Sequence, residues 1–515
     1  MFRTLFQLKN KSSILFAVLV WSLLLVRFGY RFGTGDQVEL LPYTQYLYDT
    51  TLFAHDFFIQ GLNASLPNER TVMAHLLLPF VNQLELLCFL LQFLSTIVLI
   101  LGLENLARRF IQHKYLAWLA ILAALIPLND YTLGNVELYS ECFQASALAV
   151  AIVVWAINLF LDRKYLFASV LLSLATFIQL LEGLDVMLVL SAVLLVAVIK
   201  KEVSLKTFIG FLSIYAFTSG FYLVLIFMQK NISSEITNQE LFKILFEFRH
   251  PHHFIFSSFP KIKTIVFALL AISSVIFFSK RSSTLFHFSL ICCAGIVFYI
   301  IAVDGLHNIL IGNFQFYKTT QWLKFLGVVS IVGLAEEFLF RKTDWLNLLK
   351  FEKEILITGL LSSWLVIVCF QNILPYHVPF QIFCLKENDD AVSICRQIKT
   401  NTPKNAVFIQ PFDNTELKFH AQRSSYVEFK ANVRNKLFVR EWANRVQEVF
   451  DVNYEMKEKG FTLQQKADEF FYHLDKPHLD LLKQKGVTHL FTRKKFPPAE
   501  GTLILSNNTY AVYQL

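Results

Sequence analysis

The chain has 515 residues, of which 55% are hydrophobic and 17% are charged, and its formal net charge is +8. A soluble domain cannot bury so much apolar surface, so this composition excludes an ordinary soluble enzyme and predicts a membrane protein. The basic residues do not alternate with aromatic residues in a groove-like pattern, so we expect no binding to nucleic acid.

Eleven apolar runs are predicted to cross the bilayer. They lie at about 13–30, 71–103, 115–129, 142–161, 165–181, 184–199, 206–228, 263–279, 284–303, 320–340 and 354–373. The third, fifth and sixth runs are short. No small-residue cleavage site follows the first run, so we interpret it as a retained helix rather than as a removed signal peptide.

Every second connection between these runs is rich in Lys and Arg. Examples are Arg108 and Arg109, Arg163 and Lys164, Lys200 and Lys201, Lys280 and Arg281, and Arg341 and Lys342. These connections share the side of the N-terminus, which the positive-inside rule makes cytoplasmic. An odd number of spans then places the C-terminal part of the chain outside.

Two of the outer connections, 32–70 and 229–262, are long enough to hold structure of their own. Within them, residues 38–53 and 239–248 carry apolar side chains at helical spacing, as helices at a membrane interface do. We therefore expect an interfacial helix in each connection.

From about residue 375 the pattern changes to that of a soluble α/β domain. Helices are expected at 389–400 and 479–485, and strands at 406–410, 425–430, 487–492, 502–505 and 510–513. The predicted organisation is a membrane domain at 1–373 followed by an outer α/β domain at 374–515. Cys384 and Cys395 lie in a stretch where a disulfide is allowed, and the sequence does not decide whether they pair.

Acidic residues gather in the outer connections. Asp36 and Glu39 follow the first run, where an ionised carboxylate can accept a proton from a hydroxyl or hold a divalent cation. The simpler interpretation is an acidic turn at the start of a helix. Asp130 and Glu137 lie in a tight connection, where carboxylates so near the bilayer cost free energy unless they are paired, solvated or functional.

Glu182 and Asp185 interrupt an apolar stretch that otherwise extends over 165–199. We interpret this pair as the charged tip of a helical hairpin.

Arg249, His250, His252 and His253 form a cluster of potential anion ligands. An Arg can bind a phosphate through two hydrogen bonds, and a His can donate one more. A metal site is the second interpretation, although His residues so close in sequence form a weak ligand pattern. Lys318 either contacts a phosphate or extends to the membrane interface.

The segment Gly35-Asp36-Gln37-Val38-Glu39 after the first span, the long outer loops and the outer C-terminal domain together resemble the GT-C superfamily of membrane glycosyltransferases. More closely, Gly35-Asp36-Gln37, Leu40-Leu41-Pro42, Arg249-His250-Pro251-His252-His253 and Arg423-Ser424-Ser425-Tyr426-Val427 resemble bacterial membrane proteins of this GT-C-like kind. The resemblance implies a polytopic α-helical membrane protein with about eleven transmembrane helices and a C-terminal α/β domain.

The resemblance also implies an activity. Such an enzyme transfers a sugar from a polyprenyl-phosphate donor to a glycan, lipid or protein acceptor, on the outer face of the bacterial inner (cytoplasmic) membrane. The N-terminus would be cytoplasmic and the C-terminal domain periplasmic.

In that family the acid after the first span is the catalytic base or a metal partner, and here only Asp36 inherits this role. Many relatives carry two adjacent acids, whereas Gln37 follows Asp36 in this chain. It therefore stays open whether Asp36 works with Glu39, with Asp130 or alone, and whether Mg²⁺ or Mn²⁺ is needed. The candidate supports for the acceptor or the metal are Glu39, Asp130 and Glu137. Arg249, His250, His252, His253 and Lys318 would stabilise the lipid-phosphate leaving group.

Two other classes of protein fit the same composition. A transporter is one, although charged residues inside the predicted spans are scarce and no two halves carry paired interrupted helices. A non-catalytic membrane assembly or sensor protein, with an outer ligand-binding domain, is the other.

Overall fold

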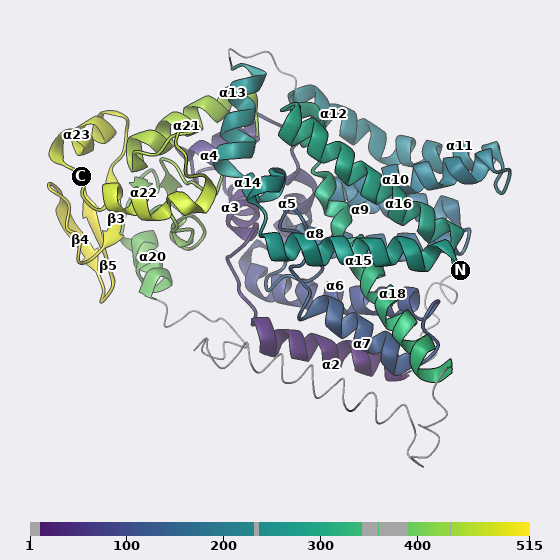
Figure 1. The fold of residues 1–515 in the computed structure, drawn as a ribbon. Helices are drawn as coiled ribbons and strands as arrows, with labels where there is room; N and C mark the ends of the chain where they lie inside the picture. Colours follow the sequence, from purple (N-terminus) through teal and green to yellow (C-terminus); the bar gives the residue numbers. More distant parts are fainter. Residues whose placement is uncertain (1–10, 231–235, 342–358, 360–389, 433) are drawn as a thin grey trace. The chain divides into compact units, whose positions relative to one another are not determined.

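A computed structural model of the protein describes residues 11–230, 236–341, 359, 390–432 and 434–515. This part of the chain is mostly helical, with one small sheet near the C-terminus (Figure 1). It divides into two compact units, each assembled from three separate segments. Unit 1 takes its residues from 1–30, 89–221 and 252–383, and unit 2 from 31–88, 222–251 and 384–515.

Unit 1 is a bundle of apolar helices. Its longer helices are α2 (Lys11–Phe28), α6 (Leu84–Ala107), α7 (Lys114–Leu125), α8 (Ala145–Leu161), α9 (Tyr165–Ile178), α10 (Leu180–Ile199), α11 (Leu205–Tyr215), α15 (Lys261–Ser279), α16 (Ser283–Ile300) and α18 (Thr320–Arg341). Short helical turns connect them, including η2 (Ala216–Gly220), η5 (Ile301–Gly305), α17 (Ile309–Gly312) and η6 (Phe316–Thr319). Each of the first ten predicted spans overlaps a helix, and the eleventh, at 354–373, lies outside the described residues.

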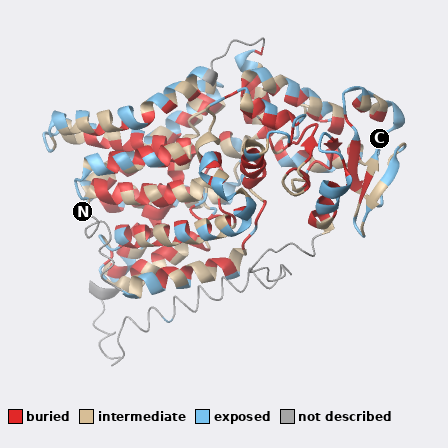
Figure 2. Ribbon diagram, turned by 180° about the vertical axis from the view of Figure 1, so that it is seen from behind, coloured by how far each residue is buried: buried red, intermediate tan, exposed pale blue. Residues whose placement is uncertain are grey.

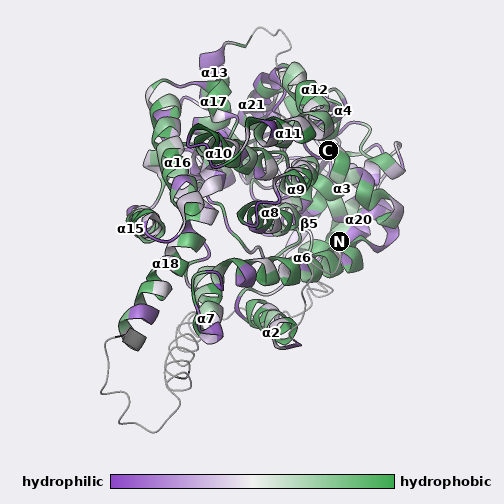
Figure 3. Ribbon diagram, turned by 90° about the vertical axis from the view of Figure 1, so that its right-hand side faces the viewer, coloured by the Kyte–Doolittle hydropathy of each residue, from purple (hydrophilic) through white to green (hydrophobic). Residues whose placement is uncertain are grey.

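Six helical stretches are long and apolar enough to cross a membrane, judged by length and composition. They are Lys11–Phe28, Thr71–Ala107, Leu180–Ile199, Leu205–Met228, Lys261–Ser279 and Ser283–Gly305. Three shorter apolar helices, α7, α8 and α9, accompany them. Figure 3 shows apolar residues distributed along most of these helices. These stretches support a membrane protein, and the full number of spans stays a prediction.

The helices of unit 1 pack closely where small residues lie at the contact. At Gly327 of α18, an added Cβ would collide with the backbone of Leu270 on α15. At Gly102 of α6, it would collide with Val154 on α8. Glycine at such positions lets two helix backbones approach, which is the usual way in which membrane helices associate. Many of the helices combine buried with exposed residues along their length (Figure 2).

Unit 2 joins the two long loops to the C-terminal tail. The first loop forms α3 (Gln37–Tyr48), α4 (Phe57–Asn63), α5 (Thr71–Leu77) and η1 (Leu78–Gln83). The second forms α13 (Asn238–Phe242) and η3 (Lys243–Arg249), between α12 (Phe221–Lys230) and α14 (Pro251–Phe254). Helices were expected in both loops and are present in both. Helix α3 is buried continuously from Gln37 to Gln45, and within unit 2 it packs against α5, η1 and η9 (Leu417–Ala421).

The tail forms a small α/β arrangement. Its helices are α20 (Asp390–Asn401), η9 (Leu417–Ala421), α21 (Lys436–Phe450), η10 (Gly460–Leu463), α22 (Gln464–Phe471) and α23 (Lys476–Gln484). Its strands are β1 (Val407–Ile409), β2 (Ser424–Ser425), β3 (His489–Arg493), β4 (Thr502–Ser506) and β5 (Tyr510–Gln514), in the sheet order β2-β1-β3-β5-β4. Strand β1 is parallel to both β2 and β3, whereas β5 is antiparallel to β3 and β4.

Most of the elements predicted for the tail are present, including the β4–β5 hairpin. The strand expected at 425–430 is wrong beyond its first residue, because β2 ends at Ser425. Past that point the backbone carbonyl of Glu428 accepts a hydrogen bond from the Trp442 indole, 3.0 Å away, and not from a neighbouring strand. Cys395 is buried in the core of the tail beside Phe408, and Cys384 lies outside the described residues.

Candidate functional site

Asp36 stands at the start of α3. Gly33 and Gly35 both adopt positive φ angles, which turn the chain sharply into the helix. The backbone carbonyl of Asp36 accepts hydrogen bonds from the N–H groups of Glu39 and Leu40, at 3.2 and 3.1 Å. Its side chain makes no capping hydrogen bond and is exposed. The carboxylate is therefore available to a ligand at the positive end of a helix.

Glu39 has a different environment from Asp36. It is buried, and its carboxylate is ion-paired with the guanidinium of Arg70, which precedes α5. Burial lowers the pKa of Arg70 to about 10, while the nearby Asp36 carboxylate raises it and Arg434 lowers it further. The two acids that the sequence singled out thus lie near one guanidinium.

Arg249, at the end of η3, is a buried cation. It is only 3% exposed, and its Nη2 donates a hydrogen bond to the carbonyl of Lys430, 2.6 Å away. Its guanidinium lies over the rings of Phe429 and Phe461, at 4.9 and 5.2 Å from their centroids. Burial, with the charge of Arg434, lowers its pKa to about 9.

No carboxylate pairs with Arg249 among the residues that the structure describes, and its Nε has no hydrogen-bond partner there. A buried cation without a counter-ion costs free energy, so it marks a position where an anion is expected to bind. Arg434, which pairs with Glu69 at 4.0 Å, lies close enough to lower the pKa of both Arg70 and Arg249. We call Arg70, Arg249 and Arg434 the arginine cluster of unit 2.

Chemically, Asp36 offers a base and the arginine cluster offers an anion site, and Arg70 is the member of the cluster that lies near Asp36. Guanidinium groups bind phosphate through paired hydrogen bonds, and a carboxylate accepts a proton. The sequence interpretation found Asp36, Glu39 and Arg249 but missed Arg70 and Arg434. One signal for Arg70 was present, since it lies at the predicted outer end of a span, where the positive-inside rule disfavours a cation.

Asp130 and Glu137 belong to unit 1. Asp130 is ion-paired with Lys263, and Glu137 is exposed. Loss of hydration and the charge of Glu141 raise the pKa of Glu137, whereas Lys324 opposes this effect. The fully buried Lys324 donates hydrogen bonds to the carbonyls of Ala124 and Asn129, at 3.2 and 2.7 Å. This lysine lies inside a predicted span and was not identified from the sequence.

Lys318 and Glu182 form a second buried polar group in unit 1. Lys318 Nζ lies 2.8 Å from one carboxylate oxygen of Glu182, and Gln321 donates to the other at 2.7 Å. Glu182 and Asp185 are 2% and 1% exposed, so the expectation of a charged hairpin tip is wrong. Helix α10 begins at Leu180 and turns both acids into the unit, where Lys318 supplies the counter-charge for Glu182.

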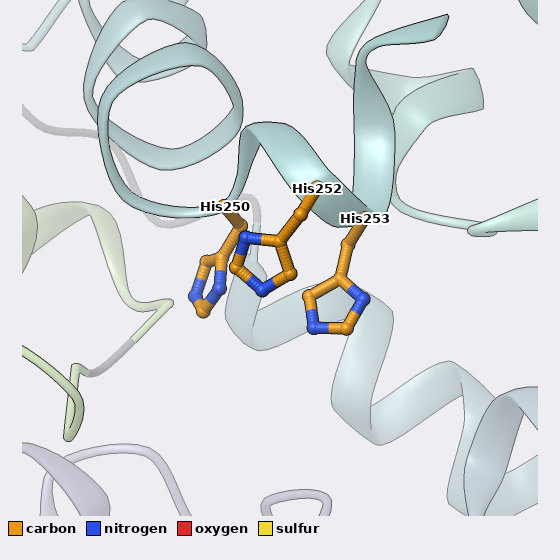
Figure 4. A group of neighbouring side chains, drawn as sticks. All are labelled: His250, His252 and His253. Atoms are coloured by element: carbon orange, nitrogen blue, oxygen red, sulfur yellow. The ribbon is translucent and has the colours of Figure 1, made fainter. Parts of the chain in front are cut away.

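His250, His252 and His253 come from one continuous stretch of four residues around the start of α14. Figure 4 shows their rings gathered on the same side of this short helix. Each offers one ligand atom, and these atoms lie within 4.8 Å of one another. The rings of His252 and His253 are 4.2 Å apart, and Nδ1 of His253 lies 2.7 Å from the carbonyl oxygen of Gly134.

A family model described as "Domain of unknown function (DUF6798)" matches residues 389–449. No curated protein sequence matches the chain. Two solved structures of the oligosaccharyltransferase AglB from Archaeoglobus fulgidus are similar at 11% identity.

One of these structures contains an inhibitory peptide and a dolichol-phosphate. It has a TM-score of 0.43, and the match covers 95% of this chain and 70% of that chain. The other contains a tethered acceptor peptide. It has a TM-score of 0.41, with 94% and 68% covered. At these scores the likeness carries no argument about function.

Proposed function

We propose that the protein is a membrane glycosyltransferase that moves a sugar from a polyprenyl-phosphate-linked donor to an acceptor. The observation that carries this proposal is the exposed carboxylate of Asp36 beside Arg70, in the same unit as the buried guanidinium of Arg249, which no carboxylate neutralises within the described part of the chain. This reaction needs a general base for the acceptor hydroxyl and a binding site for the phosphate of the donor. The GT-C-like sequence around Asp36 supports the same assignment.

In the proposed reaction, Asp36 accepts the proton of an acceptor hydroxyl while that oxygen attacks the anomeric carbon of the donor sugar. The bond between this carbon and the lipid-phosphate oxygen breaks, and the configuration inverts. The arginine cluster neutralises the charge that grows on the departing phosphate, and such stabilisation is usually the largest contribution to catalysis. Glu39 acts as a positioning residue, because its carboxylate holds Arg70.

The residues beside Asp36 in unit 2 do not fit the Mg²⁺ or Mn²⁺ ion that the sequence left as a possibility. Such an ion prefers several free oxygen ligands. Glu39 is already paired with Arg70, so it cannot serve as a second free carboxylate. The proposed mechanism therefore assigns charge neutralisation to guanidinium groups and includes no step at a metal ion.

We place the protein in the bacterial inner membrane, with the N-terminus cytoplasmic and the tail periplasmic. The alternation of basic connections along the sequence supports this orientation. The acceptor would then be a glycan, lipid or protein that reaches the outer face.

The test uses the full-length protein in liposomes, with a panel of polyprenyl-phosphate donors that carry labelled sugars. We expect release of polyprenyl phosphate together with a labelled product. Asp36→Asn should lower the rate at least about 100-fold, the usual scale for loss of a general base, without changing thermal unfolding. Asp49→Asn is the matched control, since this acid lies in the same loop and bonds to Thr51.

If Asp36→Asn keeps the wild-type rate, the catalytic assignment is wrong. If no donor is turned over and one of the compounds is instead carried across the bilayer, the protein is a transporter.

A further inference from the structure

We propose that His250, His252 and His253 bind a transition-metal ion of the zinc class. The observation is geometric. Three imidazole nitrogens lie within 4.8 Å of one another, on residues from a single four-residue stretch, so the local backbone alone brings them together (Figure 4). Nothing in this proposal depends on the glycosyltransferase assignment.

The three imidazole nitrogens lie up to 4.8 Å apart, which is slightly farther than in a zinc site, so small movements of the side chains would allow all three to bind one ion. Zinc–nitrogen bonds are about 2.0–2.1 Å long, so nitrogens in a tetrahedral site lie about 3.3 Å apart. Rotations about the side-chain bonds of half-buried residues cover the remaining distance. Pro251 fixes the backbone at the first position of α14, which holds the stretch in place.

A contact of His253 prepares its ring for a metal. Its Nδ1 lies 2.7 Å from the carbonyl oxygen of Gly134, and a carbonyl can only accept a hydrogen bond. Nδ1 must therefore carry the proton, and Nε2 keeps its lone pair. Metal-binding histidines are commonly oriented in this way by a carbonyl or carboxylate on the other ring nitrogen.

The donor set selects the class of metal. Three imidazoles suit zinc, copper, nickel or cobalt, whereas magnesium, calcium and manganese prefer oxygen ligands. Three protein ligands also leave a fourth position for water or an incoming group, as in catalytic zinc sites. The rival interpretation is a phosphate contact by protonated histidines. A metal ion requires a lone pair on each ligating nitrogen, whereas a phosphate requires an N–H group that donates to it, so the two interpretations can be separated by experiment.

The test uses full-length protein, purified in detergent without a polyhistidine tag and stripped of metal. Co²⁺ is titrated while its visible absorption is recorded, and Zn²⁺ is titrated by calorimetry. We expect about one ion per chain, with the intense visible absorption of four-coordinate Co²⁺. His252→Gln/His253→Gln should weaken binding at least about 100-fold, because it removes two of the three ligands.

His473→Gln is the matched control, since His473 is exposed and lies outside this group. Zn²⁺ should raise the midpoint of thermal unfolding in the wild type and in this control but not in the double variant. If the double variant does not fold, His250→Gln replaces it and should weaken binding at least about tenfold.

Unchanged metal affinity in a folded histidine variant overturns the proposal. So does an absence of saturable Co²⁺ and Zn²⁺ binding in the wild type. Histidine-dependent binding of inorganic phosphate to the metal-free protein would likewise overturn it, in favour of the anion interpretation.

Discussion

The guanidinium of Arg70 is ion-paired with the carboxylate of Glu39, and the carboxylate of Asp36 lies near the same guanidinium. Glu39 lies in the first turn of α3, whereas Arg70 directly precedes α5, so one ion pair links two helices of the first outer loop. This arrangement gives the two acids different roles. Glu39 fixes the position of Arg70, and Asp36 keeps an exposed carboxylate.

Glu39→Gln should lower the free energy of unfolding by about 1–2 kcal/mol, because a partly buried guanidinium loses its counter-ion. The measurement is chemical unfolding of the purified protein in detergent. Glu441→Gln is the control, since it breaks only the surface pair of Glu441 with Arg445 and should cost less than about 0.5 kcal/mol. Equal stability of the two variants would contradict a structural role for Glu39.

Arg249→Met should lower the affinity for the lipid phosphate without lowering the stability of the fold. Replacement of a buried, unpaired cation by an apolar side chain of similar length should change the free energy of unfolding by no more than about 1 kcal/mol. Affinity for a short-chain polyprenyl phosphate should nevertheless fall at least about tenfold, since the charged hydrogen bonds to phosphate are lost. Calorimetric titration with this lipid, beside chemical unfolding, gives both values. A stable variant with unchanged lipid affinity would remove Arg249 from the proposed phosphate site.

Lys418→Met should be among the most destabilising single changes in unit 2. Lys418 Nζ lies 3.2 Å from Asp56 and 2.8 Å from Glu428, and all three side chains are buried. Loss of the lysine leaves two carboxylates buried together, at a cost of about 3–5 kcal/mol.

The control for this prediction is Lys404→Met. Lys404 pairs with Asp49 at 3.4 Å but is 63% exposed, so its loss should cost less than about 1 kcal/mol. Chemical unfolding compares the two variants. A double variant, Lys418→Met with Glu428→Gln, should recover part of the loss because one buried charge is removed with its partner.

The environment of His489 predicts that the free energy of unfolding of the tail decreases at acidic pH. Burial, with the charge of Arg423, lowers its pKa to about 4, below the ordinary value of about 6.5 for an unfolded chain. Between these values the unfolded chain binds a proton that the folded chain excludes. Stability is therefore fully present above about pH 6.5 and falls by about 3 kcal/mol as the pH drops toward 4.

His489→Gln should flatten this part of the curve of unfolding free energy against pH. His478→Gln provides the control, because His478 is exposed beside Asp475 and its loss should leave the slope from His489 in place. An unchanged slope in His489→Gln would assign the acid sensitivity to another group.

The sequence predicted the parts of the fold that depend on local patterns. Long apolar runs located the helices of unit 1, and turn residues located the β4–β5 hairpin. Asp36 was identified because it follows the first apolar run, in a segment that resembles the acidic motif of GT-C enzymes. These features need only neighbours along the chain.

Features that depend on distant residues were missed. Glu182 and Asp185 looked like an exposed tip, because nothing near them indicates that Lys318 pairs with Glu182 in the interior. Arg434 comes from the tail and Arg70 from the first loop, so no spacing rule relates them. The three histidines are a different case: they were noticed as a cluster because they are close in sequence, but the sequence does not give the directions of their side chains, and the structure shows that their nitrogens converge.

The construction of unit 2 from 31–88, 222–251 and 384–515 has a consequence for biogenesis. Arg70 and Arg249 are synthesised long before Lys430, whose carbonyl accepts a hydrogen bond from Arg249, and before Arg434, which lies near both arginines. During translation the apolar and charged groups of the early loops therefore lack their contacts with the tail until the tail has been synthesised. Contacts so distant in sequence form slowly, and chains in this state are prone to aggregate. Truncation within the tail should thus disrupt the segment around Asp36, although that segment itself is left intact.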